Sequence, residues 1–104
     1  MSLVIERETL NYRHERLSVT GEVDYATGPE LGAAIRTSLD TPGLGRLDVD
    51  LSHVTFLDSD GIRVLLEGRH AALADHITFR ICKVGARVRR ILEMTGVLAV
   101  LTRP

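Results

Sequence analysis

The sequence has no tryptophan, a single cysteine and only four aromatic side chains among its 104 residues. Cys82 cannot form a disulfide within the chain, which argues against a disulfide-stapled secreted domain and predicts a reducing, cytoplasmic setting. The few aromatics form no basic–aromatic stripe, so we expect none of the stacking platform of single-stranded nucleic-acid binders. The four histidines show no metal-ligand spacing with Cys82, and we therefore expect no structural metal and no cofactor.

Long apolar runs and recognisable catalytic motifs are also missing. No run approaches the ~20 apolar residues that span a bilayer, and residues 1–6 lack the features of a signal peptide, so we expect no membrane insertion. The chain contains no phosphate-binding loop and no dinucleotide fingerprint. Paired carboxylates such as Asp48 and Asp50 do acid–base chemistry only in a cleft that shifts their pKa values, and a chain this short has little room for one. We expect one domain, 1–104, that is not an enzyme.

Charge is nearly balanced overall but unevenly distributed along the chain. The formal net charge is −1. Residues 1–75 carry seven basic and 13 acidic side chains, whereas residues 76–104 carry six basic and one acidic. A nucleic-acid-binding domain is usually basic as a whole, so direct nucleic-acid binding is not expected. The asymmetry can orient a protein partner; an ordinary solvated surface, with the signs mixed by folding, is the alternative.

The most informative stretch runs from residue 46 to residue 66. Apolar and polar residues alternate over 46–52, which predicts a half-buried strand with Leu47, Val49 and Leu51 inward. The polar run Asp58-Ser59-Asp60-Gly61 follows, with Asp58 or Ser59 suited to cap a helix. From Ile62 the apolar spacing becomes helical, through Leu65, Leu66 and Leu73. The stretch is therefore strand, polar elbow and helix, where "elbow" denotes residues 58–61.

The remaining elements form a framework around this stretch. Residues 3–9 predict a charged edge strand, paired as an antiparallel hairpin with residues 17–23, and Gly21 indicates a bulge or close backbone packing. Thr27 and Glu30 have capping-box spacing at the start of a helix that ends near Leu39. A further strand covers 77–82, a helix covers 86–94, and 97–101 form either a last strand or a packed tail. The expected fold class is α/β, with a mixed sheet of about four to five strands covered mainly on one face by helices.

Several of these runs resemble the STAS domain family, and more narrowly the small bacterial anti-sigma factor antagonists. The central match consists of Asp50-Leu51-Ser52, Val54, Phe56-Leu57-Asp58-Ser59 and Gly61-Ile62. Weaker matches are Gly21-Glu22-Val23-Asp24 and the late segment 88–96. The resemblance covers nearly the whole chain and implies the STAS fold.

The resemblance also implies a function and a site. Family members bind an anti-sigma factor, often itself a serine kinase, and thereby free a sigma factor. Members switched by phosphorylation carry Ser or Thr just before the glycine, where this chain has Asp60; Ser59 is an alternative acceptor. The implied partner-binding and regulatory residues are Ser52, Glu22, Asp24, Asp58, Ser59, Asp60 and Gly61.

Two functions remain open at this point. The first is an antagonist of an anti-sigma factor, acting as a monomer or weak homodimer. The second is an accessory STAS subunit of a larger assembly, such as a lipid or anion transporter. We expect substitution of Ser59 or Gly61 by arginine to impair partner binding with little loss of fold.

Overall fold

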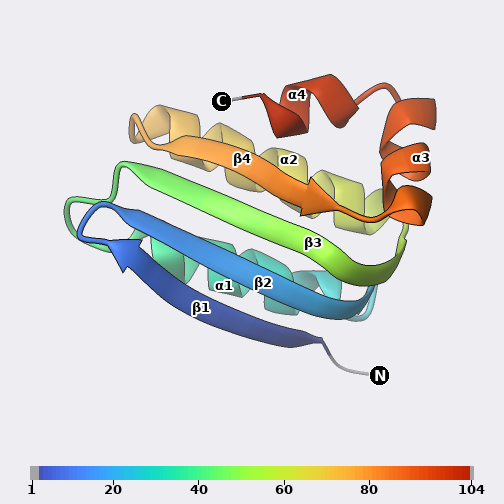
Figure 1. Cartoon of the computed structure of the whole chain (residues 1–104), viewed down its shortest axis with the longest axis horizontal. Helices are drawn as coiled ribbons and strands as arrows, with labels where there is room; N and C mark the ends of the chain where they lie inside the picture. The colour runs from blue at the N-terminus through green and yellow to red at the C-terminus, as the bar shows by residue number, and fades with distance from the viewer. Residues whose placement is uncertain (1–2, 104) are drawn as a thin grey trace.

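A computed structural model describes residues 3–103, which form a four-stranded sheet and four helices (Figure 1). In chain order the elements are β1 (Val4–Asn11), β2 (His14–Val23), α1 (Gly28–Leu39), β3 (Arg46–Leu57), α2 (Ser59–Ala74), β4 (Thr78–Val84), α3 (Ala86–Met94) and α4 (Leu98–Thr102). The sheet order is β1-β2-β3-β4; β1 and β2 are antiparallel, whereas β3 runs parallel to both β2 and β4. The predicted mixed α/β fold is confirmed.

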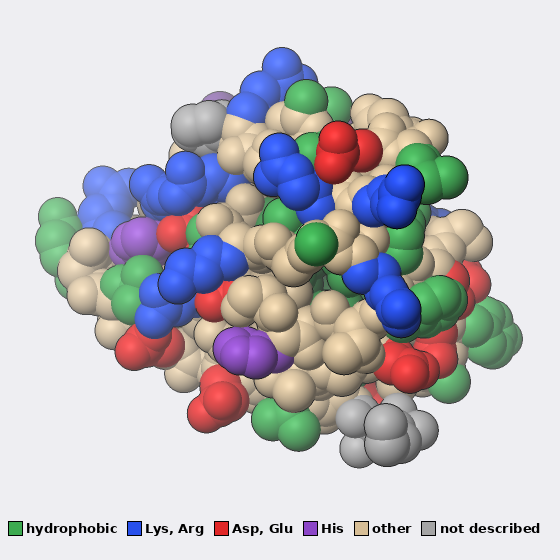
Figure 2. Space-filling view, turned by 45° about the vertical axis from the view of Figure 1, so that its right-hand side comes forward, with side chains coloured by type: hydrophobic (Ala, Val, Ile, Leu, Met, Phe, Trp, Pro, Cys, Tyr) green, Lys and Arg blue, Asp and Glu red, His purple; other side chains and the backbone are tan. Residues whose placement is uncertain are grey.

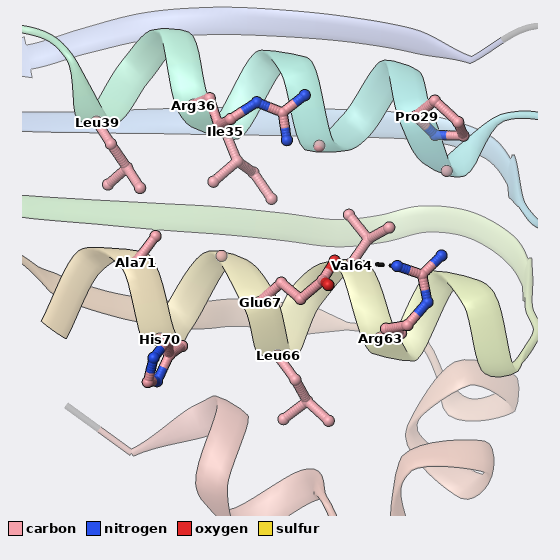
Figure 3. A pocket seen from close by; sticks show the side chains of 13 residues that line it. Pro29, Ile35, Arg36, Leu39, Arg63, Val64, Leu66, Glu67, His70 and Ala71 are labelled. Atoms are coloured by element: carbon pink, nitrogen blue, oxygen red, sulfur yellow. Dashed lines mark hydrogen bonds and ion pairs between the residues drawn. The ribbon is translucent and has the colours of Figure 1, made fainter. Parts of the chain in front are cut away.

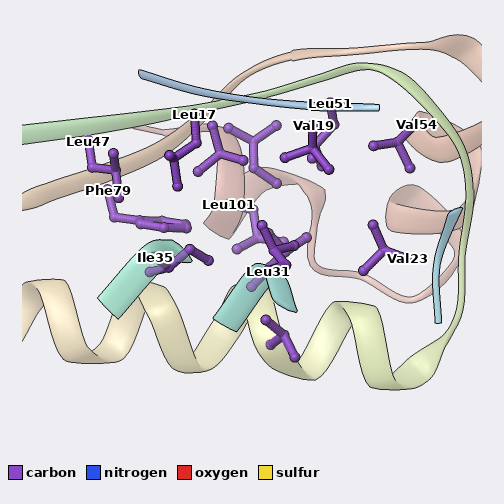
Figure 4. Packing of buried hydrophobic residues seen from close by; sticks show 14 of the residues in the cluster. Leu17, Val19, Val23, Leu31, Ile35, Leu47, Leu51, Val54, Phe79 and Leu101 are labelled. Atoms are coloured by element: carbon purple, nitrogen blue, oxygen red, sulfur yellow. The ribbon is translucent and has the colours of Figure 1, made fainter. Parts of the chain in front are cut away.

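Helices α1 and α2 pack side by side on one face of the sheet, and the hydrophobic core lies between the two layers (Figures 1 and 4). The predicted inward residues of β3, Leu47, Val49 and Leu51, are all fully buried. The core also contains Leu17, Val19, Val23, Leu31, Ile35 and Leu65. Because β2, β3 and β4 are parallel, their carboxyl ends meet at one edge of the sheet, and helices α1, α2 and α3 all begin there.

Two local expectations, on Leu73 and Leu66, are corrected. Leu73 is 52% exposed, and Ala72 takes the buried position in the last turns of α2. Leu66 is only half-buried, whereas Leu65 is fully buried. Of the two alternatives for residues 97–101, the packed tail is confirmed: Gly96 adopts a positive φ of 77°, the chain reverses, and Leu101 of the short helix α4 enters the core beside β4. The bulge predicted at Gly21 is confirmed by a register shift and a φ of 120°.

The helix-free face of the sheet is polar, and it buries one charge. Asp48 lies among cationic side chains: its carboxylate accepts hydrogen bonds from His14 (2.9 Å) and from Arg46 (3.0 Å). Burial opposes the charged form of Asp48, but these hydrogen bonds outweigh it and hold the pKa below its usual value. Asp48 therefore acts as the centre of a structural ion-pair network. Nearby Cys82 is half-buried, and burial raises the pKa of its thiol.

A second buried carboxylate lies on the helix side, where β1 and β2 meet the end of α1. Arg7 donates to both carboxylate oxygens of Glu15, at 2.7 and 3.0 Å. These hydrogen bonds lower the pKa of Glu15 although burial opposes them. Paired in this way, Glu15 connects the edge strand to the core.

Glu15 should make stability depend on acidity. A carboxylate with a lowered folded-state pKa contributes stability that is present above its unfolded pKa of about 4.3 and is lost as pH falls through the folded pKa. We expect Glu15→Gln to destabilise the protein by about 1–3 kcal/mol at pH 7, with the deficit shrinking below pH 4. Urea unfolding of both proteins at pH 7, 5, 4 and 3 measures this, and a deficit that does not change with pH would contradict it.

No helix formed by residues 3–103 is long and apolar enough to cross a lipid bilayer.

Candidate functional site

The elbow between β3 and α2 is held by one aspartate. Asp58 is the N-cap of α2, in extended conformation, and its carboxylate accepts a hydrogen bond from the Gly61 N–H at 3.0 Å. The other carboxylate oxygen accepts from the Tyr25 N–H at 3.2 Å, across 33 residues of sequence. Of the two capping candidates, the structure selects Asp58. It both closes the helix N-terminus and ties it to the loop between β2 and α1.

Gly61 is buried where the elbow passes the end of β2. A Cβ atom at this position would lie 2.8 Å from the carbonyl oxygen of Val23 and 2.5 Å from Cδ1 of Leu57. Both distances are shorter than real Cβ contacts, and the Val23 oxygen is backbone. The expectation that Gly61 tolerates arginine with little loss of fold is therefore wrong, because the position is part of the packing rather than of the outer surface.

The loop from β2 to α1 is ordered by Asp24 and Thr27. The Asp24 carboxylate accepts hydrogen bonds from the N–H groups of Thr27 and Ala26, both at 3.0 Å, which lower its pKa. The Thr27 hydroxyl donates to the Glu22 carbonyl at 2.7 Å, and it accepts from the Asp24 N–H. No capping hydrogen bond comes from the Thr27 side chain, so the predicted capping box is wrong. Asp24 thus shapes the loop that lies against the elbow.

The accessible part of the elbow consists of Ser59 and Asp60. Ser59 is exposed in the first turn of α2. Asp60 is partly exposed and pairs at 3.4 Å with Arg63, one turn further along the helix. A carboxylate in the first turn suits the positive end of the helix dipole. Glu22, in the adjacent strand end, is also exposed. The structure therefore brings Glu22, Asp24 and the elbow together.

Ser52 lies apart from this group. It is exposed on β3, six residues before Asp58, so that roughly 15–20 Å of strand separates the two positions. Its hydroxyl and its N–H both donate to Asp50, at 2.6 and 2.8 Å. These hydrogen bonds are local, between residues two apart on β3, and they do not join Ser52 to the elbow.

Two aromatic residues beside the elbow were not anticipated from the sequence. Tyr25 is 79% exposed, and its N–H donates to the Asp58 carboxylate. Phe56 is 40% exposed and precedes Asp58 by two residues in the sequence. Exposed aromatic side chains among polar neighbours are typical of protein interfaces. The available signals were that Tyr25 directly follows the polar Asp24 and that Phe56 alternates with the inward-facing Leu57 on the same strand.

This edge of the molecule carries charge of both signs. α3 begins beside the end of β3 and presents Arg87, Arg89 and Arg90 outward. Figure 2 turns this edge forward and shows basic side chains gathered around α3, with acidic ones below them. Within residues 3–103 no group of three or more His, Cys, Asp or Glu side chains is arranged to hold a metal ion. The edge around the elbow is thus exposed, charged and flanked by aromatic side chains.

Comparison with known proteins gives the family. A family model described as "Mlab, STAS domain" matches residues 7–102. The chain belongs to the STAS family. Among curated relatives, the anti-sigma-B factor antagonist of Staphylococcus aureus is 31% identical over 96 residues, covering 92% of this chain and 87% of the relative. The resemblance read from the central motif is thereby confirmed.

Solved structures agree with this family. An anti-sigma factor antagonist from Mycobacterium paratuberculosis is 28% identical, with a TM-score of 0.81 over 95% of this STAS chain and 82% of that one. The antagonist SpoIIAA in its unphosphorylated form matches with a TM-score of 0.79 over 96% of this chain and 86% of that one. At 17% identity the SpoIIAA likeness shows the fold alone.

Proposed function

We propose that this STAS protein is a bacterial anti-sigma factor antagonist, a regulator that binds an anti-sigma factor and so releases a sigma factor. The observation that carries the proposal is the 31% identity to an anti-sigma-B factor antagonist over 92% of the chain. The curated relatives are antagonists, so the accessory transport subunit is not favoured. The protein acts by binding in the cytoplasm rather than by catalysis, as one STAS domain over residues 1–104.

The docking surface proposed here is centred on the elbow. It comprises Asp58, Ser59, Asp60 and the neighbouring Glu22 and Asp24. Tyr25 and Phe56 add the apolar area that protein interfaces use as anchors. Gly61 contributes by letting the elbow close against β2. We leave Ser52 outside this surface because of its distance along β3 and its local hydrogen bonds.

The protein is proposed to be a monomer or weak homodimer. β1 is one of the two edge strands of the sheet, and Glu6, Arg7 and Glu8 lie along it. Two copies paired antiparallel through this edge would place like charges opposite one another in the central registers. The edge strand therefore discourages sheet extension.

Ser59→Arg tests the docking surface. It places bulk and positive charge at the positive end of α2, so we expect affinity for the cognate anti-sigma factor to fall by about 10- to 100-fold. The exposed position should cost the fold no more than about 1 kcal/mol. Isothermal titration with the purified partner measures affinity, and thermal unfolding checks the fold.

Ser52→Arg makes the same change outside the docking surface and is the matched control, and Arg89→Ala tests the basic helix α3. Both variants should bind the anti-sigma factor with an affinity within about threefold of wild type. Normal binding by Ser59→Arg together with loss of binding by Arg89→Ala would move the interface to α3. Loss of binding by Ser52→Arg would extend the surface along β3.

Asp60 stands where phosphorylated members of the family carry the acceptor hydroxyl, and we infer that it gives this position a permanent charge. A phosphate adds about −1.5 to −2 charges at pH 7, whereas aspartate adds −1 and lacks the third oxygen. Arg63, which pairs with Asp60 at 3.4 Å, neutralises part of that charge. Asp60 is therefore compatible with partner binding but reduces it.

Asp60→Ser should tighten partner binding by about three- to tenfold, because it removes a charge from a contact that phosphate disrupts. If the partner is a kinase, it should phosphorylate Asp60→Ser and leave the wild type unmodified, since Ser59 stands one residue too early. Mass spectrometry after incubation with partner and ATP, with Ser59→Ala in the Asp60→Ser background as control, assigns the site. Stoichiometric phosphate on wild-type Ser59 would refute the inference, and identical binding by the two proteins would leave Asp60 as a helix-start residue only.

A further inference from the structure

A groove of about 670 Å³ runs between α1 and α2 on the outer side of the helix layer (Figure 3). Ile35 and Leu39 from α1 and Val64 and Ala71 from α2 point toward it. Its volume falls within the range of small-molecule sites, about 300–1,000 Å³, and its lining is mainly aliphatic. One end of the groove borders the docking surface proposed above, because Arg63 at its rim also pairs with Asp60.

Two glycines line the α1 side of the groove. Gly28 and Gly32 lie one turn apart on α1 and face Val64 of α2. A Cβ atom at Gly32 would lie 3.7 Å from Cγ1 of Val64 and 3.4 Å from Nη1 of Arg36. Val64 therefore lies against the helix backbone at these glycines, and the Arg36 guanidinium group lies beside Gly32.

The charged groups at the groove are arranged asymmetrically. The Arg36 side chain folds back over Gly32 toward the start of α1, and Arg63 stands opposite it on α2 (Figure 3). Arg63 is already paired, with Glu67 at 3.1 Å and Asp60 at 3.4 Å. Within residues 3–103 no ion pair involves Arg36. The rim thus offers one unmatched cation.

The other end of the groove is apolar. Leu39 and Ala71 line it, with His70 at its edge. From Gly32 to Leu39 the groove extends about 10 Å along α1, at 1.5 Å per residue. Both helices also begin at the Arg63 end, so their dipoles favour a negative group there rather than at the Leu39 end.

We propose that this groove binds a single-chain amphiphilic anion, a medium-chain fatty carboxylate. The carboxylate is held by Arg36, with Arg63 opposite, and the alkyl chain lies along Ile35 and Leu39 against Ala71. The charge complementarity calls for one negative group, and the length of the aliphatic floor calls for a chain of roughly eight to ten carbons.

Decanoate, used well below its micelle concentration with the full-length chain at pH 7.5, is the probe. Isothermal titration should show one saturable site with a dissociation constant of about 0.1–1 mM. Arg36→Gln should weaken decanoate binding at least tenfold. Decanol, which lacks the charge, should bind the wild type as weakly as decanoate binds Arg36→Gln. Arg89→Gln, the same change on α3, should bind decanoate as the wild type does, and thermal unfolding should show both variants folded.

Amide chemical shifts locate the binding. The largest changes on titration should fall on Gly32, Gly68 and their neighbours, and should be lost in Arg36→Gln. Equal decanoate affinity in Arg36→Gln and wild type, non-saturable binding, or shifts confined to the elbow or the open sheet face would each overturn the proposal.

Discussion

Gly61→Ala is expected to destabilise the protein by about 2–4 kcal/mol, although alanine is the better helix former. The new methyl group would meet the Val23 carbonyl oxygen at 2.8 Å and Cδ1 of Leu57 at 2.5 Å. A flexible side chain could move aside, but the Val23 oxygen belongs to β2 and accepts the Asp58 N–H at 3.2 Å. Relieving the clash therefore separates α2 from the end of β2.

Gly32→Ala is the matched control, because it makes the same change in a neighbouring helix. There the methyl group meets only Arg36 and Val64 side chains, at 3.4 and 3.7 Å. Loss of glycine from a helix interior should stabilise the protein by about 0.5–1 kcal/mol. Urea unfolding monitored by circular dichroism compares the two variants. Equal stability of Gly61→Ala and wild type would show that the elbow can relax, and partner binding could then tolerate side chains at this position.

Leu65→Ala is expected to cost about 3–5 kcal/mol, which is a large part of the 5–15 kcal/mol that stabilises a typical small domain. Leu65 is fully buried in the layer between α2 and the sheet. Truncation leaves a cavity in this layer, between α2 and the elements it packs against, and partial relaxation of the surroundings recovers only part of the loss. The loss should appear as a lower urea midpoint with an unchanged slope.

Leu66→Ala provides the comparison at the adjacent position. Leu66 is half-buried and points away from the sheet, toward α4, so its truncation should cost only about 1 kcal/mol (Figure 3). If the two variants lost equal stability, the orientation of α2 on the sheet would be wrong. The ratio of the two effects is more informative than either value, because both start from the same unfolded chain.

Stability and docking are connected at the elbow through Asp58. Its side chain joins the first turn of α2 to the Tyr25 N–H, and its own N–H joins β2. The shape of the exposed surface at Ser59 and Asp60 is therefore set by contacts that also hold the fold. Variants that test the interface at this edge should therefore change exposed positions such as Ser59 and leave buried positions such as Gly61 unchanged.

The sequence by itself determined the elements and their class. Alternation over 46–52 and helical spacing from Ile62 depend on periods of 2 and 3.6 residues, which any reader of the chain can count. The polar run 58–61 marked the helix start, because capping is chemistry between near neighbours in sequence. The STAS motif in the same stretch then pointed to the family.

The tertiary structure decided which apolar residues are covered and how polar ones are paired. Helical spacing made Leu65, Leu66 and Leu73 equivalent, and only packing against the sheet buried the first, half-buried the second and exposed the third. Asp48 and Glu15 became buried charges because partners 34 and eight residues away supplied hydrogen bonds. The groove, likewise, exists only where two helices with glycines face each other. These outcomes depend on contacts between distant segments, whose geometry no local pattern specifies.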